Sequence, residues 1–379
     1  MRIALVHDWL TGMRGGERVL DAVARAYPDA DLYTLIHQPN VTTPAIEALR
    51  IQASPLNRLP GIGRHYRKLL PLYPWAARQL KIEGYDLVLS ISHAVAKNAC
   101  ITDGAPHVSY CLTPMRYVWD QIDAYLGRGV RRAVAAPLVA ALRRQDVAHS
   151  NVRQVGRFVA ISNSVADRIQ RHYGRSSNII HPPVDVNRVR PNGRDPEDFF
   201  LLIGGFVQYK RENIAIEAFR DRPDRLVVVG DGPTRGRLES TAPSNVEFTG
   251  RLSDEEVTGY FQTCRALIHP QEEDFGIAAV EAQAAGRPVI AYGHGGALDT
   301  VRPLLTAHPT GEPQWADDPN ATGIYFSEQT PEALGAALDA FAKHSPLLDA
   351  DRIRAHAERF SCERFLAELA AELADALDR

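Results

Sequence analysis

Two stretches of this chain begin with the same succession of a short apolar strand, a glycine-containing loop and a helix with periodic apolar residues. The first is RIALVHDWLTGMRGGERVLDAVARAY, residues 2–27, and the second is FFLLIGGFVQYKRENIAIEAF, residues 199–219. This succession is typical of the first strand, loop and helix of a doubly wound sheet. Because it occurs twice, far apart in the chain, the sequence predicts two Rossmann-like α/β domains.

Further strands are expected after each opening. They are YDLVLSIS, HVSYCL and GRFVAIS in the first half, and RLVVVGDGP, NVEFTG, RALIHP and RPVIAYG in the second. Strands that alternate with helices form parallel sheets buried on both faces. A proline-rich, polar stretch at 182–196 is the expected linker, so we place one domain at 1–190 and the other at 191–379. The last segment, roughly 346–379, is expected to be helical.

Length and composition set limits on what the chain can be. The 379 residues suit two globular domains, and the N-terminal apolar run is typical of a buried strand rather than a signal peptide. No apolar run is long enough to span a bilayer. The four cysteines form no CxxC pair and Asp317-Asp318 fits a turn, so we expect no metal site, no disulfide framework and a reducing cytoplasm.

Charge is distributed unevenly along the chain. Residues 1–190 hold 25 basic and 14 acidic residues, whereas the remainder holds 18 and 32. Two acid-free stretches, 48–82 and 124–145, combine this positive charge with apolar and aromatic residues. The combination suits an anionic membrane surface, although each stretch alone fits a solvated helix with an apolar inner face equally well. Because no recognition motif accompanies the basic residues, we expect no nucleic-acid partner.

The stretch QEEDFGIAAVEAQAAGRPVIAYG, residues 271–293, holds two glutamates around a Phe-Gly pair. We expect a helix to begin near Ile277, with Glu273 before it and Glu281 in its second turn. A helix N-terminus offers free amides to an anion, and nearby carboxylates can accept hydrogen bonds from hydroxyl groups. The pattern therefore favours a ligand such as a nucleotide sugar. Taken singly, each glutamate also fits a structural role, Glu273 in compensating the helix dipole and Glu281 on a solvated face.

Several motifs together resemble retaining glycosyltransferase family 4. EEDFGIAAVEA and GRPVIAYGHGGALDTV are similar to its donor motif. HDWLTGMRGGERVL, YDLVLSISHAVAKN, TPMRYVWD, GDGPTRGRLES and GRLSDEEV resemble the branch of mannosyltransferases for bacterial O-antigen and exopolysaccharide. The resemblance implies the GT-B fold: an N-terminal acceptor-binding domain and a C-terminal nucleotide-sugar-binding domain face a cleft, and the C-terminal helix often crosses back.

The resemblance also assigns roles to residues. Glu281 is similar to the residue that binds the ribose, and Glu273 to the acid beside the donor sugar hydroxyls. Lys210, with Arg211 beside it, is similar to the lysine that neutralises the leaving diphosphate. Backbone amides would be supplied to the sugar and the diphosphate by Phe275, Gly276 and Ile277, and close approach to the phosphates would be allowed by Gly15 and Gly16. The remaining predicted acceptor or cleft residues are Asp8 and Arg116.

Two positions depart from the family's pattern. Relatives commonly have arginine where Gly205 stands, and often histidine, near C6 of the donor sugar, where Leu112 stands. Arg211, Arg14 and Arg116 are candidates to compensate. An apolar side chain at 112 would favour a C6 methyl group, and hence a 6-deoxyhexose donor; the alternative is that Leu112 fills the core and another residue, such as His93, contacts C6.

The expected function is transfer of a hexose or 6-deoxyhexose, with retention, from a GDP-mannose-type donor to a lipid-linked glycan in bacterial surface polysaccharide synthesis. The enzyme would need no metal and no cofactor, and would lie in the cytoplasm, peripherally on the inner face of the plasma membrane. An alternative is a degenerate member that binds a nucleotide sugar or a partner transferase without turnover. A nicotinamide-dependent enzyme is disfavoured because no G-x-G-x-x-G opens either domain.

Overall fold

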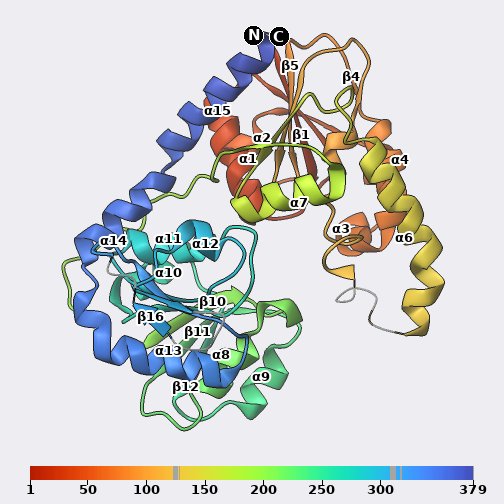
Figure 1. The fold of residues 1–379 in the computed structure, drawn as a ribbon. Coiled ribbons are helices and arrows are strands. Elements are labelled where there is room, and N and C mark those ends of the chain that lie inside the picture. Colours follow the sequence, from red (N-terminus) through yellow and green to blue (C-terminus); the bar gives the residue numbers. More distant parts are fainter. Residues whose placement is uncertain (123–126, 128, 308–312, 316–317, 379) are drawn as a thin grey trace. The chain divides into compact units, whose positions relative to one another are not determined.

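The computed structural model describes residues 1–122, 127, 129–307, 313–315 and 318–378, and its contacts divide the chain into two compact units. Unit 1 comprises Met1–Pro183 with Glu363–Arg379, and unit 2 comprises Val184–Cys362. Unit 2 begins ahead of residue 191, where the sequence placed the second domain, because Val184 already forms a bridge with Ser361. The final helix belongs to unit 1 (Figure 1).

Unit 1 is built on a seven-stranded parallel sheet with the order β3-β2-β1-β5-β7-β8-β9. Its strands are β1 (Ile3–Leu10), β2 (Asp31–His37), β3 (Arg50–Ala53), β5 (Leu87–Ser92), β7 (His107–Cys111), β8 (Arg157–Ala160) and β9 (Asn178–Ile179), and a separate pair is formed by β4 (Lys81–Ile82) and β6 (Cys100–Ile101). The chain adds strands on one side of β1 and then returns to add the rest on the other, beginning with β5. This makes the carboxyl ends of β1 and β5 a switch point, where open α/β sheets bind ligands.

Helices and short 3-10 segments complete unit 1. They are α1 (Gly15–Ala26), α2 (Pro44–Glu47), η1 (Pro55–Arg58), α3 (Ile62–His65), η2 (Tyr66–Leu72), α4 (Tyr73–Arg78), η3 (Ala96–Asn98), α6 (Val130–Ala148) and α7 (Asn163–Tyr173). The first basic stretch is therefore a series of short turns rather than one helix, because Pro55, Pro71 and Pro74 interrupt it. The longest of these helices, α6, contains most of the second basic stretch.

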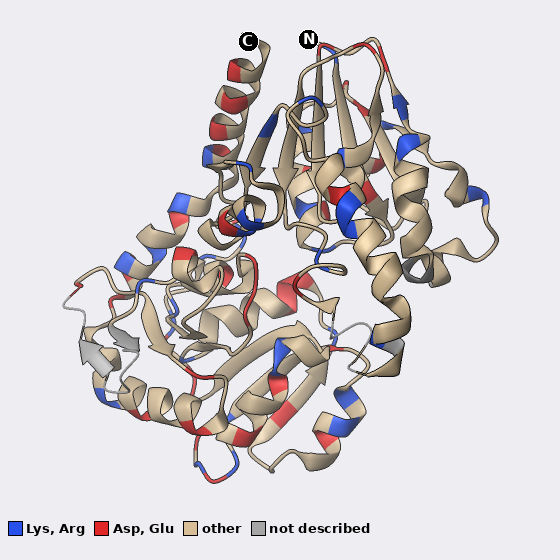
Figure 2. Ribbon diagram, turned by 45° about the vertical axis from the view of Figure 1, so that its right-hand side comes forward, with Lys and Arg blue, Asp and Glu red and all other residues tan. Residues whose placement is uncertain are grey.

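The C-terminal helix α15 (Cys362–Leu377) packs on unit 1. Glu372 accepts hydrogen bonds from Arg157 at 3.0 Å and from Asn178 at 2.7 Å. The ring of Phe365 meets that of Tyr110 edge-on, with centroids 5.5 Å apart. Figure 2 shows acidic residues at intervals along this helix, and apolar residues lie between them in the sequence. The apolar stripe expected for the C-terminal segment thus faces the strands β7, β8 and β9 of unit 1.

Unit 2 repeats the architecture with a six-stranded parallel sheet of order β12-β11-β10-β13-β14-β17. Its strands are β10 (Phe200–Gly205), β11 (Leu226–Asp231), β12 (Val246–Gly250), β13 (Leu267–His269), β14 (Val289–Tyr292) and β17 (Gly323–Phe326), with a hairpin of β15 (Leu305–Ala307) and β16 (Pro313–Trp315). The switch point lies between β10 and β13, because β11 and β12 follow on one side and β14 and β17 on the other.

The helices of unit 2 surround an apolar core built on this sheet. They are η4 (Gln208–Lys210), α8 (Glu212–Ala218), α9 (Arg235–Thr241), α10 (Asp254–Thr263), α11 (Ile277–Ala284), α12 (Ala297–Thr300), α13 (Pro331–His344), η5 (Ser345–Leu347), α14 (Ala350–Ala357) and η6 (Glu358–Phe360). Phe200, Phe219 and Phe341 pack their rings edge-on within the core. In the part of the chain described, no helix combines the length and the apolar character needed to cross a membrane.

Candidate functional site

An ion pair occupies the switch point of unit 2. Lys210 follows β10 and Glu273 follows β13, and the Lys210 ammonium donates a hydrogen bond to the Glu273 carboxylate. Burial opposes the charge on Glu273, but the Lys210 ammonium outweighs it and lowers the pKa of Glu273 to about 2. Burial likewise opposes the charge on Lys210, and Glu273 outweighs it, so the pKa of Lys210 is raised. The pair therefore holds a fixed positive and a fixed negative charge at neutral pH.

Two buried polar residues support this pair. His269 lies at the end of β13, with its Nε2 3.9 Å from Glu273. Its Nδ1 is 3.2 Å from Nε2 of the Gln271 side chain. Burial lowers the pKa of His269, so its ring is neutral at pH 7. Glu212, at the start of α8, is 3% exposed, and burial raises its pKa to about 7. Its Oε1 has no hydrogen-bond partner among the residues that the structure describes.

The N-terminus of α11 forms the next part of the site. Gly276 caps it with a φ of 95°, and a Cβ there would lie 3.3 Å from His269 Nε2. The helix's own hydrogen bonds begin at the amides of Ala279 and Val280, which both donate to Gly276 O. The Ile277 amide therefore precedes the first amides that donate within the helix, as expected for an anion-binding helix terminus.

A glycine-containing turn packs against the same loop. The Gly296 amide donates to Glu273 O at 2.7 Å, and a Cβ on Gly296 would lie 2.2 Å from the Phe275 Cα. Phe275 itself is buried, with its ring 5.5 Å from that of Phe360. Its side chain thus anchors the loop, and only its backbone can serve a ligand. The motif GHGG, residues 293–296, is needed so that this turn can approach the loop closely.

Glu281 lies in α11 with a cation beside it. Its carboxylate accepts a hydrogen bond from Arg188, whose other terminal nitrogen donates to Thr258 Oγ1 at 2.9 Å and to Asp254 O at 3.1 Å. Glu281 is 9% exposed, so its charge is stabilised by this partner rather than by water alone.

The two other positions predicted near the diphosphate lie on the β10 loop. Arg211 has a left-handed backbone conformation and lines a pocket of ≈ 110 Å³ with Glu212, Arg237 and other residues. At Gly205, a Cβ would have its nearest neighbour, Asp231 O, 4.0 Å away. Position 205 therefore has room for the Cβ of a larger residue.

Unit 1 brings its predicted residues to its own switch point. Gly16, in the first turn of α1, packs against Leu112, because a Cβ there would lie 2.8 Å from Leu112 Cδ1 and 3.5 Å from His7 Cε1. Gly15 precedes it at the helix start. Arg116 follows the same loop as Leu112 and is half-buried. Asp8 is fully buried and accepts four backbone hydrogen bonds, so it contributes to a site through the loop it holds rather than by touching a ligand.

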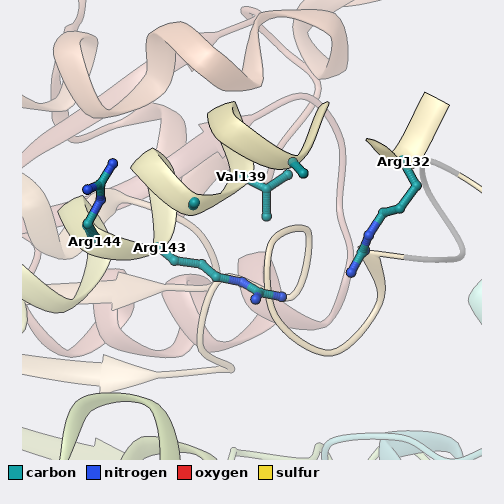
Figure 3. A pocket seen from close by; sticks show the side chains of 6 residues that line it. Arg132, Val139, Arg143 and Arg144 are labelled. Carbon is teal, nitrogen blue, oxygen red and sulfur yellow. The ribbon is translucent and has the colours of Figure 1, made fainter. Parts of the chain in front are cut away.

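A separate pocket of ≈ 420 Å³ opens along α6 (Figure 3). Its lining combines arginines with small apolar side chains: Arg132, Ala136, Val139, Ala140, Arg143 and Arg144. Arg143 is held in place because its Nε donates to Val118 O at 2.6 Å and its guanidinium lies over the Trp119 ring. Beside the pocket, Val130 and Val134 are 80% and 77% exposed. The helix thus presents an apolar and basic outer surface.

Family models match the two halves of the chain. Glycosyltransferase Family 4 matches residues 13–188, and Glycosyl transferases group 1 matches residues 185–358. Over 99% of this chain and 100% of the other, the fold is that of HepE of Anabaena, solved in complex with UDP, with a TM-score of 0.72 at 18% identity. The chain belongs to the GT-B glycosyltransferases. The expected fold, two Rossmann-like domains with parallel sheets, is thereby confirmed.

Two curated glycosyltransferases illustrate the similarity in sequence. O-antigen chain mannosyltransferase C of Escherichia coli is 37% identical over 101 residues, which are 25% of this chain and 27% of that protein. A GDP-mannose-dependent alpha-mannosyltransferase of Mycolicibacterium smegmatis is 35% identical over 157 residues, 39% of this chain and 40% of that protein. The alignments thus span less than half of the length of either relative.

Sequence reasoning missed three polar residues at the unit 2 switch point of this glycosyltransferase, namely Arg188, Glu212 and His269. Arg188 lies in the stretch that was interpreted as a linker, and nothing in its neighbours indicates a partner in α11. Glu212 directly follows Lys210-Arg211, so its position on the β10 loop was a usable signal. Within the described residues, no three His, Cys, Asp or Glu side chains gather as a metal site would need, and independence from metal stays a prediction.

Proposed function

We propose that this chain is a retaining glycosyltransferase that moves a hexose or 6-deoxyhexose from a GDP-mannose-type nucleotide sugar to a lipid-linked glycan in bacterial surface polysaccharide synthesis. The observation that carries the proposal is the Lys210–Glu273 pair at the switch point of unit 2, next to the N-terminus of α11. One ligand with both phosphates and hydroxyls suits this combination, because the cation and the free amides bind phosphate whereas the carboxylate binds hydroxyls.

In this proposal Lys210 acts on the leaving group. As the bond between the sugar and the diphosphate breaks, negative charge grows on the diphosphate, and a fixed cation beside it lowers the energy of that state. Glu273 keeps the ammonium in place and accepts hydrogen bonds from the sugar. Because the pKa of Glu273 is lowered to about 2, the carboxylate is ionised at neutral pH and can only accept. With no base positioned by these residues, the leaving phosphate is proposed to take the proton of the acceptor hydroxyl.

Glu281 is proposed to bind the nucleotide ribose. Its carboxylate accepts a hydrogen bond from Arg188, and a carboxylate can accept several hydrogen bonds at once. Ribose hydroxyls can therefore be added without removing Arg188. The mannosyltransferase names of the two curated relatives support GDP-mannose as the first donor to test, and the structure of HepE with UDP supports a nucleotide donor in general.

The lipid-linked acceptor and the membrane surface are proposed from unit 1. The acid on α6, Asp146, is buried and paired with Lys97 at 2.7 Å, so it does not offset the arginines on the outer surface. An apolar surface ringed by cations fits anionic lipid headgroups. We place the protein in the cytoplasm, peripherally on the inner face of the plasma membrane.

A second function is favoured by Gly205 and Leu112, where the family's arginine and histidine are missing: binding of a nucleotide sugar without turnover. Donor hydrolysis separates the two. The purified chain is incubated with GDP-mannose, UDP-glucose and a dTDP-sugar, and released nucleoside diphosphate is measured. Slow release from one donor, abolished in Lys210→Ala and retained in the surface control Lys343→Ala, supports the transferase. If the wild type and Lys210→Ala both bind a donor and neither releases nucleoside diphosphate, the second function is supported.

A further inference from the structure

The switch point of unit 1 carries a polar pair of its own. Asp8 lies in β1, and His93 follows directly after β5. Both oxygens of the Asp8 carboxylate accept backbone hydrogen bonds: Oδ2 from His93 and Ala94 at 2.6 and 2.9 Å, and Oδ1 from Val95 and Ala96 at 2.6 and 2.7 Å. The loop after β5 is thus fixed to β1 by a single buried carboxylate.

Asp8 also lies beside the ring of His93. Nδ1 is buried and lies 3.2 Å from Asp8 Oδ2 without hydrogen-bond geometry, and the ring stands edge-on to Trp9 with centroids 4.4 Å apart. The side chain is 20% exposed. Nε2 is not among the enclosed atoms, and the described residues give it no hydrogen-bond partner. Hence one ring nitrogen is turned toward a carboxylate and the other is available.

Burial keeps the ring of His93 neutral against the charges around it. They come from Asp8, His7, Glu17 and Arg116. Burial has the largest effect and, with His7 and Arg116, outweighs the two carboxylates, so the pKa of His93 is lowered. Behind it, His7 is fully buried, with its Nε2 3.9 Å from Glu17, and its Nδ1 bonds to Ile91 O at 3.0 Å. A carboxylate 3.2 Å from Nδ1 favours the neutral tautomer with its proton on that nitrogen, and this tautomer leaves a lone pair on Nε2.

We propose that His93, oriented by Asp8, is a substrate-binding residue whose Nε2 accepts a hydrogen bond from a sugar hydroxyl. The inference rests on the proposed transferase function and adds a residue to it. A hydroxyl is the fitting partner because it has a proton to donate, whereas a phosphate oxygen at neutral pH has none and would face a lone pair. Asp8 is a positioning residue here, which replaces the direct acceptor contact expected from sequence.

The parallel with unit 2 strengthens the assignment. There, the residues after the two strands at the switch point are Lys210 and Glu273, a pair suited to phosphate and hydroxyls. In unit 1 the switch point holds Asp8, inside β1, and His93, directly after β5, and neither is a cation at neutral pH. The two switch points therefore differ chemically: that of unit 2 offers a cation for the diphosphate, and that of unit 1 offers a neutral ring for carbohydrate.

The test uses two replacements of His93 that distinguish the role of Nδ1 from that of Nε2. The amide of His93→Asn takes the place of Nδ1 near Asp8 but does not reach the place of Nε2, whereas that of His93→Gln does reach it. The matched control is His107→Asn. His107 is buried in the same sheet, but at the amino end of β7, with Nδ1 2.7 Å from Gln154 O and Nε2 2.9 Å from Ser90 Oγ.

The ring signals of His93, identified by their loss in His93→Asn, are followed by NMR in the full chain during titration with methyl α-mannoside, GDP-mannose and GDP. We expect a shift with methyl α-mannoside if the hydroxyl belongs to the acceptor, or with GDP-mannose but not GDP if it belongs to the donor. A shift with GDP alone, or none with either saccharide, overturns the inference.

Turnover is measured alongside. We expect His93→Asn to lower kcat/KM about 10- to 100-fold, which is the effect of losing one buried hydrogen bond. Its affinity for GDP should be unchanged. Activity should recover partly in His93→Gln and stay near normal in His107→Asn. Equal losses in His93→Asn and His107→Asn would indicate a structural role and also overturn it. If the wild type releases no nucleotide from any donor while the His93 signals still respond to a saccharide, the transferase proposal fails and this one stands.

Discussion

Arg188 donates a hydrogen bond to the carboxylate of Glu281, and this contact joins the segment after the first unit to the helix α11 at the position proposed to bind the nucleotide. The glutamate therefore has a cation beside it before any ribose arrives. An acid with a fixed orientation loses little freedom on binding, so its contribution to nucleotide affinity is preserved.

We expect Glu281→Ala to weaken binding of free GDP by roughly 1.5–3 kcal/mol, since charge-assisted hydrogen bonds to the ribose are lost. The measurement is isothermal titration calorimetry. Glu256→Ala, which changes an acid that caps the nearby helix α10, is the control. GDP affinity equal to that of the wild type would remove Glu281 from the nucleotide site.

Lys210→Ala should reduce kcat more than it raises KM for the donor, because the positive charge matters most when the leaving group gains charge. A loss in kcat of roughly 10²–10³ is expected for a group of this kind. Steady-state kinetics of donor hydrolysis provide both parameters, with Lys343→Ala, on the outer helix α13, as the control. Small and equal changes in both would instead describe a lysine that only pairs with Glu273.

Glu212 should make the stability of the protein depend on pH. Burial raises its pKa from the ordinary value of 4.5 to about 7, so the folded state binds a proton that the unfolded state releases. The resulting stability is fully present below pH 4.5 and is lost as the pH rises to about 7. We expect Glu212→Gln to weaken the dependence of the Tm on pH between those pH values, as measured by thermal unfolding. Glu332→Gln, an exposed acid at the start of α13, should leave the curve unchanged.

Attachment to membranes should depend on α6 and on the first basic stretch. Pelleting with anionic liposomes is expected to fall with added salt, because basic residues contribute about 1 kcal/mol each near such a surface. The double change of Arg132 and Arg144 to Glu, and that of Arg67 and Lys68 to Glu, should each reduce it. Arg225→Glu with Arg251→Glu on unit 2 is the control. Pelleting that ignores salt and all of these changes contradicts the proposal.

Leu112 should set the preference for the sugar at C6. An unsatisfied buried hydroxyl costs roughly 1–3 kcal/mol, whereas a buried methyl group contributes about 0.8 kcal/mol. If Leu112 faces C6, GDP-linked 6-deoxyhexose should compete better than GDP-mannose, and Leu112→His should shift the preference back. Competition binding measures both. A clear preference of the wild type for GDP-mannose would leave Leu112 as the core residue that packs on Gly16.

The fold was predictable because its signals are local. An apolar run, a glycine and a periodic helix lie within about thirty residues in each half, and the parallel order follows from their alternation. The start of α11 at Ile277 was predictable for the same reason, since Gly276 precedes it. Contacts between distant segments have no such local signal in the sequence. Arg188 meets Glu281 across 93 positions, and Asp8 reaches the His93 amide across 85.

The role of Asp8 shows why site chemistry was harder to predict than site position. The sequence indicated Asp8 only as an acceptor or cleft residue, and it lies in β1 at a switch point. Only the structure shows that it accepts four backbone hydrogen bonds, so that the neighbouring His93 is the residue we propose to meet a ligand. Likewise, the structure shows that Gly16 packs against Leu112, and the approach of its backbone to phosphates stays a prediction.

The chain leaves unit 1 at Pro183 and returns to it only at Glu363. During synthesis, the partners of Arg157 and Asn178 on β8 and β9 therefore emerge from the ribosome after the whole of unit 2. Unit 2 can fold as an uninterrupted segment, whereas Tyr110, Arg157 and Asn178 of unit 1 lack these partners until Phe365 and Glu372 have been made. The unit translated first is thus the last to be completed, and loss of α15 by early termination would remove part of the packing of unit 1 rather than trim a tail.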